Sequence, residues 1–298
     1  TVGYYCDESS LKEMKQKPSL SQKSVKDIDY LLEFWKGKTT NEKIISRYTE
    51  DQRELLSHCS LGEPGIAFPL YRMSGAQMNP EKLLSSGISG LINLMEHKSS
   101  LNPDFYNAVK SALVSLSNLC LRYYVEILAD ADKCKDPERA SILYKMAGNL
   151  KHIAYNKPES FWQAAQLAYL FYLVSGTYNY GRMDDYLGSY YANDIDTGAV
   201  TEEFGFSLIK NLWYLIIERN NYFDSRVILG GKDRKNMEAA DRFALAAMEA
   251  SRQTRDAVPQ LTLRCYNGMN EELYDKALEL IGEGTTYPIL YNDEVNIP

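Results

Sequence analysis

The stretch GRMDDYLGSYYAND, residues 181–194, places one arginine and three aspartates among aromatic side chains. It directly follows the apolar run FWQAAQLAYLFYLVSG at 161–176, whose composition predicts a helix that is buried on most sides. Charged groups that enter a core need partners, so we expect Arg182 to make a two-pronged contact with a carboxylate such as Asp184. That pair would pin the loop at this point, and a structural role is favoured over direct catalysis.

The adjacent carboxyl groups of Asp184 and Asp185 support a different hypothesis. Glycosidases perform acid–base chemistry with two carboxyl groups, and the 23 tyrosines of the chain fit an enzyme of that class built on a helical barrel. Adjacent residues point in different directions on a helix or a strand, so the two side chains need not share a site. A glycosidase is therefore kept only as a distant alternative.

The chain before residue 158 is predicted to be mainly helical. Apolar side chains recur at helix spacing, and a proline stands where three of the helices begin. The expected helices cover about 22–36, 80–97, 103–131 and 137–152. By contrast, EPGIAFPLYRMSGAQMNP at 63–80 has no helical period, and we interpret it as an extended segment that lines a pocket.

The second half has a different pattern. Three short runs rich in β-forming residues are bounded by glycine or proline: VILGG at 227–231, QLTLRC at 260–265 and YPILY at 287–291. Helical patterns at 236–252 and 270–283 separate them. Strand, helix, strand, helix, strand is the order of right-handed parallel crossovers. The predicted fold class is therefore α/β and predominantly helical. We find no linker in the sequence and expect the chain to form one compact piece.

Composition bounds the classes of function. The 298 residues suffice for one large domain or two small ones, and the net charge of −7 argues against a nucleic-acid partner. We find neither an uninterrupted apolar run long enough for a bilayer nor a signal peptide, so we expect no membrane association and a cytoplasmic location. The five cysteines are odd in number and widely spaced, which predicts reduced thiols and no metal site. Because the first residue is threonine, we expect a segment of a longer or processed chain.

Motifs along the whole chain stand in the order of one known family. The spacing GR-x-D-x-Y-x-x-x-Y-Y-x-x-D-x-x-x-G is formed by Gly181, Arg182, Asp184, Tyr186, Tyr190, Tyr191, Asp194 and Gly198. Further segments are FWKGKTTNEK at 34–43, EKLLSSGISGL at 81–91, KPESFWQAAQ at 157–166, LGGKDRKNMEAADRFALAAMEA at 229–250, PQLTLRCYNGMNEEL at 259–273 and YPILYNDEVNIP at 287–298. Together they resemble the glycyl radical enzymes, the pyruvate formate-lyase and diol dehydratase superfamily.

The resemblance implies a fold. The chain would be a single segment, 1–298, of one glycyl radical enzyme domain, in which 1–175 are mainly helical. Residues 176–298 would form βα units of a ten-stranded α/β barrel of the glycyl radical type.

The resemblance also implies an activity. The complete protein would cleave a C–C or C–O bond of a small polar metabolite by radical chemistry, as a dehydratase or as a lyase or transferase similar to formate acetyltransferase, in an anaerobic cell. The radical glycine and the reactive cysteine of the family are not matched in these residues. The segment would therefore hold no catalytic residue and be inactive alone. An alternative is a non-catalytic truncated paralogue that acts as a binding or assembly module.

Cofactor and partners follow from the same resemblance. The segment would bind no cofactor of its own. In the complete chain an activating enzyme that uses S-adenosylmethionine would install the glycyl radical, and the enzyme would be a homodimer that acts on a small-molecule substrate.

The resemblance assigns roles to single residues. Relatives of the diol dehydratase branch carry a His-Ser pair at the positions of Gly176 and Thr177, so only the hydroxyl of Thr177 is available to bind a substrate alcohol or carboxylate. Gln77 and Arg182 are the other candidate substrate-binding residues. Structural roles are expected for Gly181, Asp184, Tyr190, Asp194, Asn292 and Asp293. The last two follow a strand, where an Asn-Asp pair makes a turn that organises the next loop.

Overall fold

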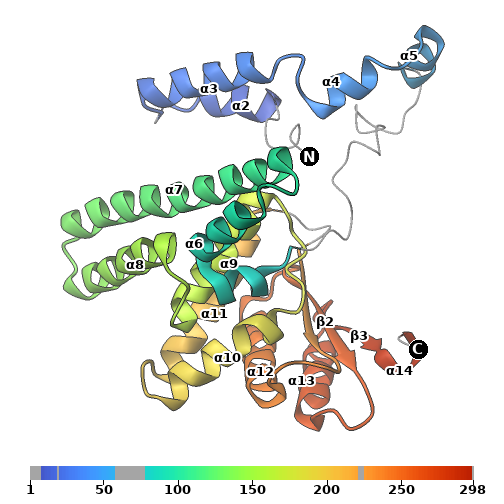
Figure 1. Ribbon diagram of the computed structural model, residues 1–298. Helices are drawn as coiled ribbons and strands as arrows, with labels where there is room; N and C mark the ends of the chain where they lie inside the picture. Colours follow the sequence, from blue (N-terminus) through green and yellow to red (C-terminus); the bar gives the residue numbers. More distant parts are fainter. Residues whose placement is uncertain (1–7, 19, 58–77, 221–224, 297–298) are drawn as a thin grey trace. The chain divides into compact units, whose positions relative to one another are not determined.

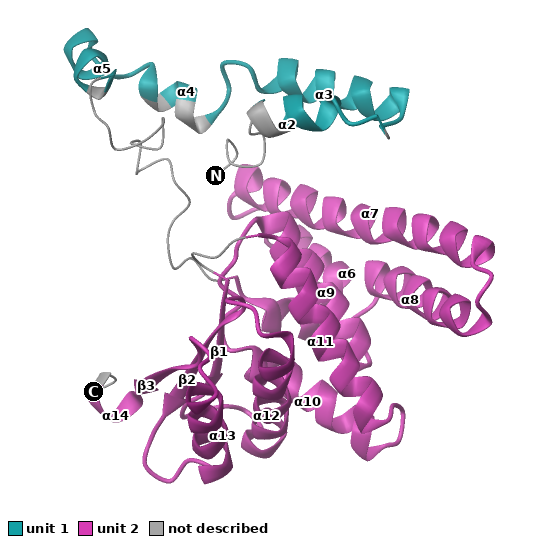
Figure 2. Ribbon diagram, turned by 180° about the vertical axis from the view of Figure 1, so that it is seen from behind, with its two compact units in different colours: residues 1–76 teal, residues 77–298 magenta. Residues whose placement is uncertain are grey.

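The computed structural model describes residues 8–18, 20–57, 78–220 and 225–296. They fall into two compact units, residues 1–76 and 77–298 (Figure 2). The elements of the first unit are α2 (Glu8–Lys15), α3 (Gln22–Trp35), α4 (Thr40–Ile45) and α5 (Glu50–Ser57). The helix expected from residue 22 is confirmed as α3, and Ser21 caps it by accepting the backbone N–H of Ser24.

The second unit begins with four helices (Figure 1). They are α6 (Pro80–Lys98), α7 (Pro103–Lys133), α8 (Pro137–Tyr155) and α9 (Phe161–Ser175). The first three are capped by Asn79, Asn102 and Asp136, each of which accepts a backbone N–H of the first turn and precedes a proline. The helix α9 buries Phe161 and Leu167 almost completely, as its apolar composition predicts. All four predicted helices are present, with ends that differ by a few residues, and α6 is kinked at Gly87, where the backbone leaves the helical conformation (φ 69°, ψ 170°).

The helix α7 is the one element of the described residues that is long and apolar enough to cross a membrane. Arg122 and Glu126 interrupt its apolar side chains, so its sequence contains no uninterrupted apolar run of that length. Core helices of soluble proteins have the same length and composition, so this helix is weak evidence for a membrane span. In this structure α7 packs against α6 and α8.

A parallel sheet follows, with the strands β1 (Arg226–Gly230), β2 (Gln260–Cys265) and β3 (Ile289–Asn292) in that spatial order. The helices α12 (Met237–Thr254) and α13 (Glu271–Gly282) connect the strands, and the short α14 (Asp293–Asn296) comes last. The register aligns Val227 with Leu261. The expected order of parallel strands and connecting helices is confirmed.

Side chains alternate across this sheet, as they do in any strand. On β1 and β2 one face is fully buried and consists of Val227, Leu229, Leu261 and Leu263, whereas all four residues of β3 are exposed. The opposite face keeps Ile228 and Thr262 partly exposed. The described part of the chain therefore covers only one side of the sheet with helices, and we call the other side the open face.

A fourth extended segment lies beside β1. The backbone N–H of Tyr180 donates to the carbonyl oxygen of Arg226, and the N–H of Ile228 donates to that of Gly181, both at 2.8 Å. Arg182 forms a parallel bridge with Ile228. Residues 180–182 therefore extend the parallel sheet by a short strand on the far side of β1 from β2.

The decisive stretch of the sequence continues from this segment into the helix α10 (Met183–Asp196). The sequence predicts a loop at this point, and this prediction is wrong, because the residues from Met183 onward are helical. Asp184 and Asp185 lie in the first turn of α10, where the helix dipole favours carboxylates. A second helix, α11 (Glu202–Glu218), then leads back to β1.

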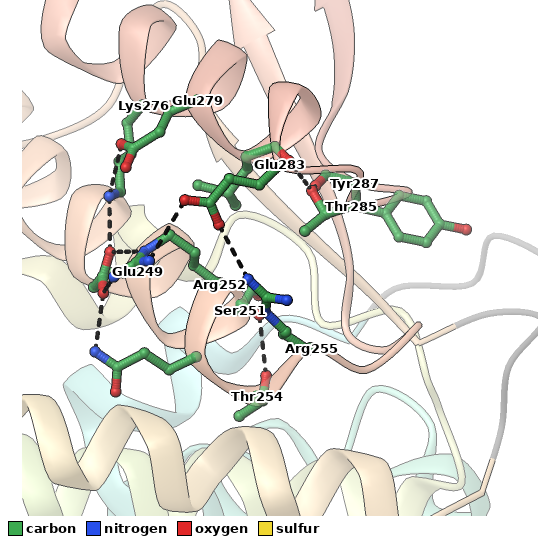
Figure 3. Close-up of polar contacts among 12 residues, drawn as sticks. Glu249, Ser251, Arg252, Thr254, Arg255, Lys276, Glu279, Glu283, Thr285 and Tyr287 are labelled. Carbon is green, nitrogen blue, oxygen red and sulfur yellow. Dashed lines mark hydrogen bonds and ion pairs between the residues drawn. The ribbon is translucent and has the colours of Figure 1, made fainter.

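Ion pairs join the last two long helices (Figure 3). The carboxylate of Glu249 in α12 accepts hydrogen bonds from Arg252 at 2.8 and 2.7 Å, and pairs with Lys276 of α13 at 2.7 Å. Arg252 also lies 3.5 Å from Glu283, directly after α13. The hydrogen bonds, first of all those of Arg252, lower the pKa of Glu249 to about 2. The junction between α12 and α13 therefore depends on ionised Glu249.

We expect acid to weaken this junction in a defined pH window. The pKa of Glu249 is below its ordinary value of 4.5, so its contribution is complete above about pH 4.5 and is lost as the pH falls toward 2. Glu249→Gln should lower the free energy of unfolding by about 1–2 kcal/mol at neutral pH, a value reduced for solvent screening. The loss should be less than half as large at about pH 3.

Urea unfolding at both pH values measures the two losses. Glu279→Gln is the matched control, because Glu279 pairs with the same Lys276 at 2.9 Å but is 49% exposed. Equal losses for Glu249→Gln at both pH values would contradict the assignment.

Candidate functional site

Charged side chains gather at the carboxyl ends of the strands. They lie at the end of, or directly after, the short strand 180–182, β1, β2 and β3, at the edge of the sheet where parallel α/β folds collect their functional loops. Most of these side chains are paired with a residue from a neighbouring strand end. We call these residues the strand-end cluster: Arg182, Asp184, Lys232, Arg234, Arg264, Asp293 and Glu294.

Asp184 forms the buried centre of this cluster. Its Oδ2 atom accepts the backbone N–H of Gly230 at 2.7 Å and an N–H of Arg234 at 3.1 Å. The side chains of Asp184 and Arg234 are both 0% exposed, and Arg234 also lies 2.7 Å from the carboxylate of Asp241. Burial raises the pKa of Asp184 to about 6 against the opposing charge of Arg234. One arginine thus balances two carboxylates inside the protein.

The expected pair between Arg182 and Asp184 is wrong. Arg182 instead donates from Nη2 to the carbonyl oxygens of Gly230 at 3.3 Å and Lys232 at 2.7 Å. Within the ranges that the structure describes, Nε of Arg182 and Oδ1 of Asp184 are buried and have no hydrogen-bond partner. Buried polar atoms normally form hydrogen bonds to protein, water or a ligand. Nε of Arg182 and Oδ1 of Asp184 are therefore available as a donor and an acceptor beside the cluster.

Asp293 joins the ends of the strands. It is 2% exposed and accepts two hydrogen bonds from Arg264, at 2.8 and 3.0 Å. It also accepts the backbone N–H of Lys232 at 3.3 Å. Asp293 therefore links the end of β3 to the end of β2 and to the loop after β1.

The neighbours of Asp293 complete this link. Glu294 pairs with the ammonium group of Lys232 at 2.7 Å and accepts the backbone N–H of Asn267 at 3.2 Å. The side chain of Asn292 accepts the backbone N–H of Glu294 at 2.9 Å, which is the local bond of an Asx turn. The structural role expected for Asn292 and Asp293 stays a prediction, and these contacts support it.

Gly230 and Gly231 allow the loop after β1 to reach the cluster. Both have positive φ, +72° and +88°. A Cβ atom on Gly230 would lie 2.6 Å from the carbonyl oxygen of Arg264, and one on Gly231 would lie 2.9 Å from Nε of that residue. The close approach of β1 and β2 at this point therefore requires glycine.

The other residues of the motif contact neighbouring helices. Asp194 is buried and accepts the backbone N–H of Phe161 at the start of α9, at 2.8 Å. Tyr190 donates its hydroxyl to the carbonyl oxygen of Leu84 in α6 at 3.4 Å. Gly181 has φ +62° and donates to the side chain of Asn179. Their structural roles stay predictions that these contacts support.

The candidate substrate-binding residues do not form one described group. Thr177 is half-buried in the segment that leads from α9 to the strand 180–182, and Arg182 lies at the end of that strand. Gln77 and most of the proposed pocket wall at 63–80 lie outside the described residues.

Burial opposes ionisation of two of the described thiols, those of Cys120 and Cys265. Cys120, Cys134 and Cys265 are free, as predicted, whereas the other two cysteines lie outside the described residues. Burial raises the pKa of Cys120 to about 12, and burial together with the charge of Asp293 raises the pKa of Cys265. No group of three or more metal-ligating side chains occurs among the residues that were described.

Comparison with known proteins decides the family. The sequence profile of the pyruvate formate lyase-like family matches residues 5–298. The chain belongs to this family. It is 30% identical over 305 residues to the (2S)-3-sulfopropanediol dehydratase of Klebsiella oxytoca, an alignment that covers 91% of this chain and 37% of that protein. It is 24% identical to the isethionate sulfite-lyase of Bilophila wadsworthia, with the same two coverages, 91% and 37%.

Solved structures agree with this family. The glycerol-bound form of the B12-independent glycerol dehydratase from Clostridium butyricum superposes with a TM-score of 0.75 at 26% identity. The superposition covers 93% of this chain and 38% of that chain. The resemblance to glycyl radical enzymes is confirmed, and the chain spans 37% to 38% of the length of these relatives.

Two arginines of the strand-end cluster are missing from the sequence-based candidates. Arg264 carries a usable signal, because an arginine inside the predicted strand QLTLRC needs a partner as much as Arg182 does. Arg234 carries none, because it lies in the polar stretch LGGKDRKN and its partner Asp184 is 50 residues away.

Proposed function

We propose that the complete protein is a glycyl radical enzyme that cleaves a C–O or C–C bond of a small polar metabolite. The observation that carries the proposal is the match of the pyruvate formate lyase-like family over residues 5–298. A dehydratase is favoured over a formate acetyltransferase, because the relatives described above at 30% and 26% identity are both named dehydratases. The substrate class would be small compounds with neighbouring hydroxyl groups.

This chain would supply part of the wall that holds the substrate. The strand 180–182 and the strands β1 to β3 would belong to a ten-stranded barrel whose interior is the open face of the sheet. Thr177 would donate or accept a hydrogen bond at a substrate hydroxyl. Arg182 retains an unpartnered Nε–H among the described residues, and Gln77 would add an amide. The whole chain would belong to one domain, with 176–298 as its barrel units.

The remaining parts of the proposal concern chemistry outside this chain. The glycyl radical, installed by an activating enzyme that uses S-adenosylmethionine, would supply the radical that the reactive cysteine of the family uses to abstract hydrogen from the substrate. The complete enzyme would be a cytoplasmic homodimer of anaerobic cells without nucleic-acid or membrane partners. These 298 residues alone would be inactive. The alternative, a non-catalytic binding or assembly module, predicts that the complete protein turns over no diol.

Thr177→Val tests the proposed substrate contact. The variant removes the hydroxyl and keeps the shape, so the KM of the complete enzyme for a 1,2-diol should rise about tenfold while kcat changes little. Thr177→Ser should restore the KM. Anaerobic initial-rate kinetics with 1,2-propanediol and glycerol measure both constants.

Thr197→Val is the matched control, because among the described residues the Thr197 hydroxyl bonds only to carbonyl oxygens at the end of α10. An unchanged KM in Thr177→Val would exclude Thr177 from substrate binding.

A further inference from the structure

One side chain, that of Arg219, holds the segment between α9 and the strand 180–182. Its Nη1 atom donates to the carbonyl oxygen of Thr177 at 2.9 Å and to the hydroxyl oxygen of Tyr180 at 2.8 Å. Its Nη2 atom donates to the carbonyl oxygen of Tyr172, in α9, at 3.4 Å. The guanidinium carbon lies 4.0 Å from the centre of the ring of Tyr178. Arg219 thus contacts both ends of the segment and its middle.

The contacts require arginine. They combine hydrogen bonds to three acceptors with stacking on an aromatic face, a geometry that the planar guanidinium offers and a lysine ammonium does not. The environment is partly dry, because Tyr172 and Tyr180 are 0% and 1% exposed. Arg219 itself is fixed at the end of α11, where its backbone N–H bonds back to the last turn of that helix.

The same contacts determine where Thr177 points. Tyr178 and Tyr180 both turn their side chains toward Arg219, and in an extended chain residues two apart share a side. The intervening Asn179 and the preceding Thr177 then take the opposite side.

Tyr180 is 1% exposed and lies on the buried side of the sheet. Gly181, with φ +62°, interrupts the alternation before Arg182, which pairs with Ile228 of the open face. The side opposite Tyr180 is therefore the open face of the sheet.

We propose that Arg219 is a positioning residue, which fixes the segment 177–180 so that the hydroxyl of Thr177 points to the open face of the sheet. This inference rests on the proposed function, in which Thr177 binds a substrate hydroxyl. Arg219 does not touch the substrate. It acts through the backbone of Thr177 and the two tyrosines.

Arg219→Ala and Arg219→Lys in the complete enzyme test the proposal. Both variants should raise the KM for 1,2-propanediol by about tenfold with little change in kcat, because a misplaced Thr177 loses the contact that it makes with bound substrate. A purely structural role would lower the active fraction, and hence kcat, at unchanged KM. Arg242→Ala is the matched control, since Arg242 is 33% exposed and forms an ion pair with Asp196. It should leave both constants unchanged.

Two further measurements sharpen the test. In the double variant, Thr177→Val should add no further rise in KM to that of Arg219→Ala, because both changes remove the same contact. In the substrate-free protein, amide hydrogen exchange of residues 177–182 should become faster in Arg219→Lys, while exchange in α12 stays unchanged.

The outcomes separate this inference from the proposed function. A raised KM in Thr177→Val together with an unchanged KM in both Arg219 variants would overturn the positioning role and leave the proposed function intact. A complete enzyme that converts no diol would overturn the proposed function. Hydrogen exchange then decides whether Arg219 fixes the segment, and unchanged exchange of residues 177–182 would overturn that as well.

Discussion

Arg234→Ala should lower the free energy of unfolding by about 3–5 kcal/mol, because it leaves the buried carboxylates of Asp184 and Asp241 without their cation. Arg234 and Asp184 are both 0% exposed, so water cannot solvate the carboxylate in place of the lost guanidinium. Proton uptake by Asp184, whose pKa is already raised to about 6, would recover only part of the loss. Equilibrium unfolding in guanidinium chloride at neutral pH measures the difference.

The control for this prediction is Arg242→Ala. Arg242 makes an ion pair of similar length with Asp196, 2.8 Å, but its partner is 61% exposed. Its removal should cost about 1 kcal/mol or less. If the two variants lose the same stability, the buried centre of the strand-end cluster contributes no more than a surface pair, and its assignment as the structural centre is wrong.

Gly230→Ala should lower the free energy of unfolding by about 3 kcal/mol or more, for two separate reasons. The left-handed backbone, with φ +72°, costs an alanine about 1–2 kcal/mol. The added Cβ would also lie 2.6 Å from the carbonyl oxygen of Arg264, which is backbone and cannot rotate away. Strands β1 and β2 must therefore separate at the point where Arg264 bonds to Asp293. Thermal and chemical unfolding give the magnitude.

Gly198→Ala separates the two contributions. Gly198 has nearly the same backbone angle, φ +70°, but no atom lies within 4 Å of the Cβ that an alanine would add. Gly198→Ala should lower the free energy of unfolding by about 1–2 kcal/mol, the contribution of the left-handed backbone alone. Equal losses at Gly198 and Gly230 would contradict the close approach of the two strand ends.

Local signals in the sequence predict most of the fold. Prolines after Asn79 and Asp136 mark two helix starts, and the β-rich runs that begin at Val227 and Gln260 mark two strands of the parallel sheet. These signals suffice because each depends on a few neighbouring residues. The helix α11 also carries such a signal, since Leu208, Leu212 and Ile216 recur at helix spacing and are buried.

The partners in the site could not be predicted in the same way. Asp184 pairs with an arginine 50 residues away, and Asp293 pairs with one 29 residues away. The nearest candidate in the sequence, Arg182, instead bonds to backbone carbonyl oxygens of the loop after β1. Which of several arginines meets which carboxylate depends on the order of the strands, and residue spacing alone does not contain that order.

Electron paramagnetic resonance of the complete protein tests the proposed function most directly. The protein is incubated without oxygen with its activating enzyme and S-adenosylmethionine, and a glycerol dehydratase with its own activating enzyme serves as the positive control. We predict a doublet signal, split by the one hydrogen that a glycyl radical retains, which appears only when the activating enzyme is present. A complete protein that shows no such signal, while the control does, would contradict its assignment as a glycyl radical enzyme.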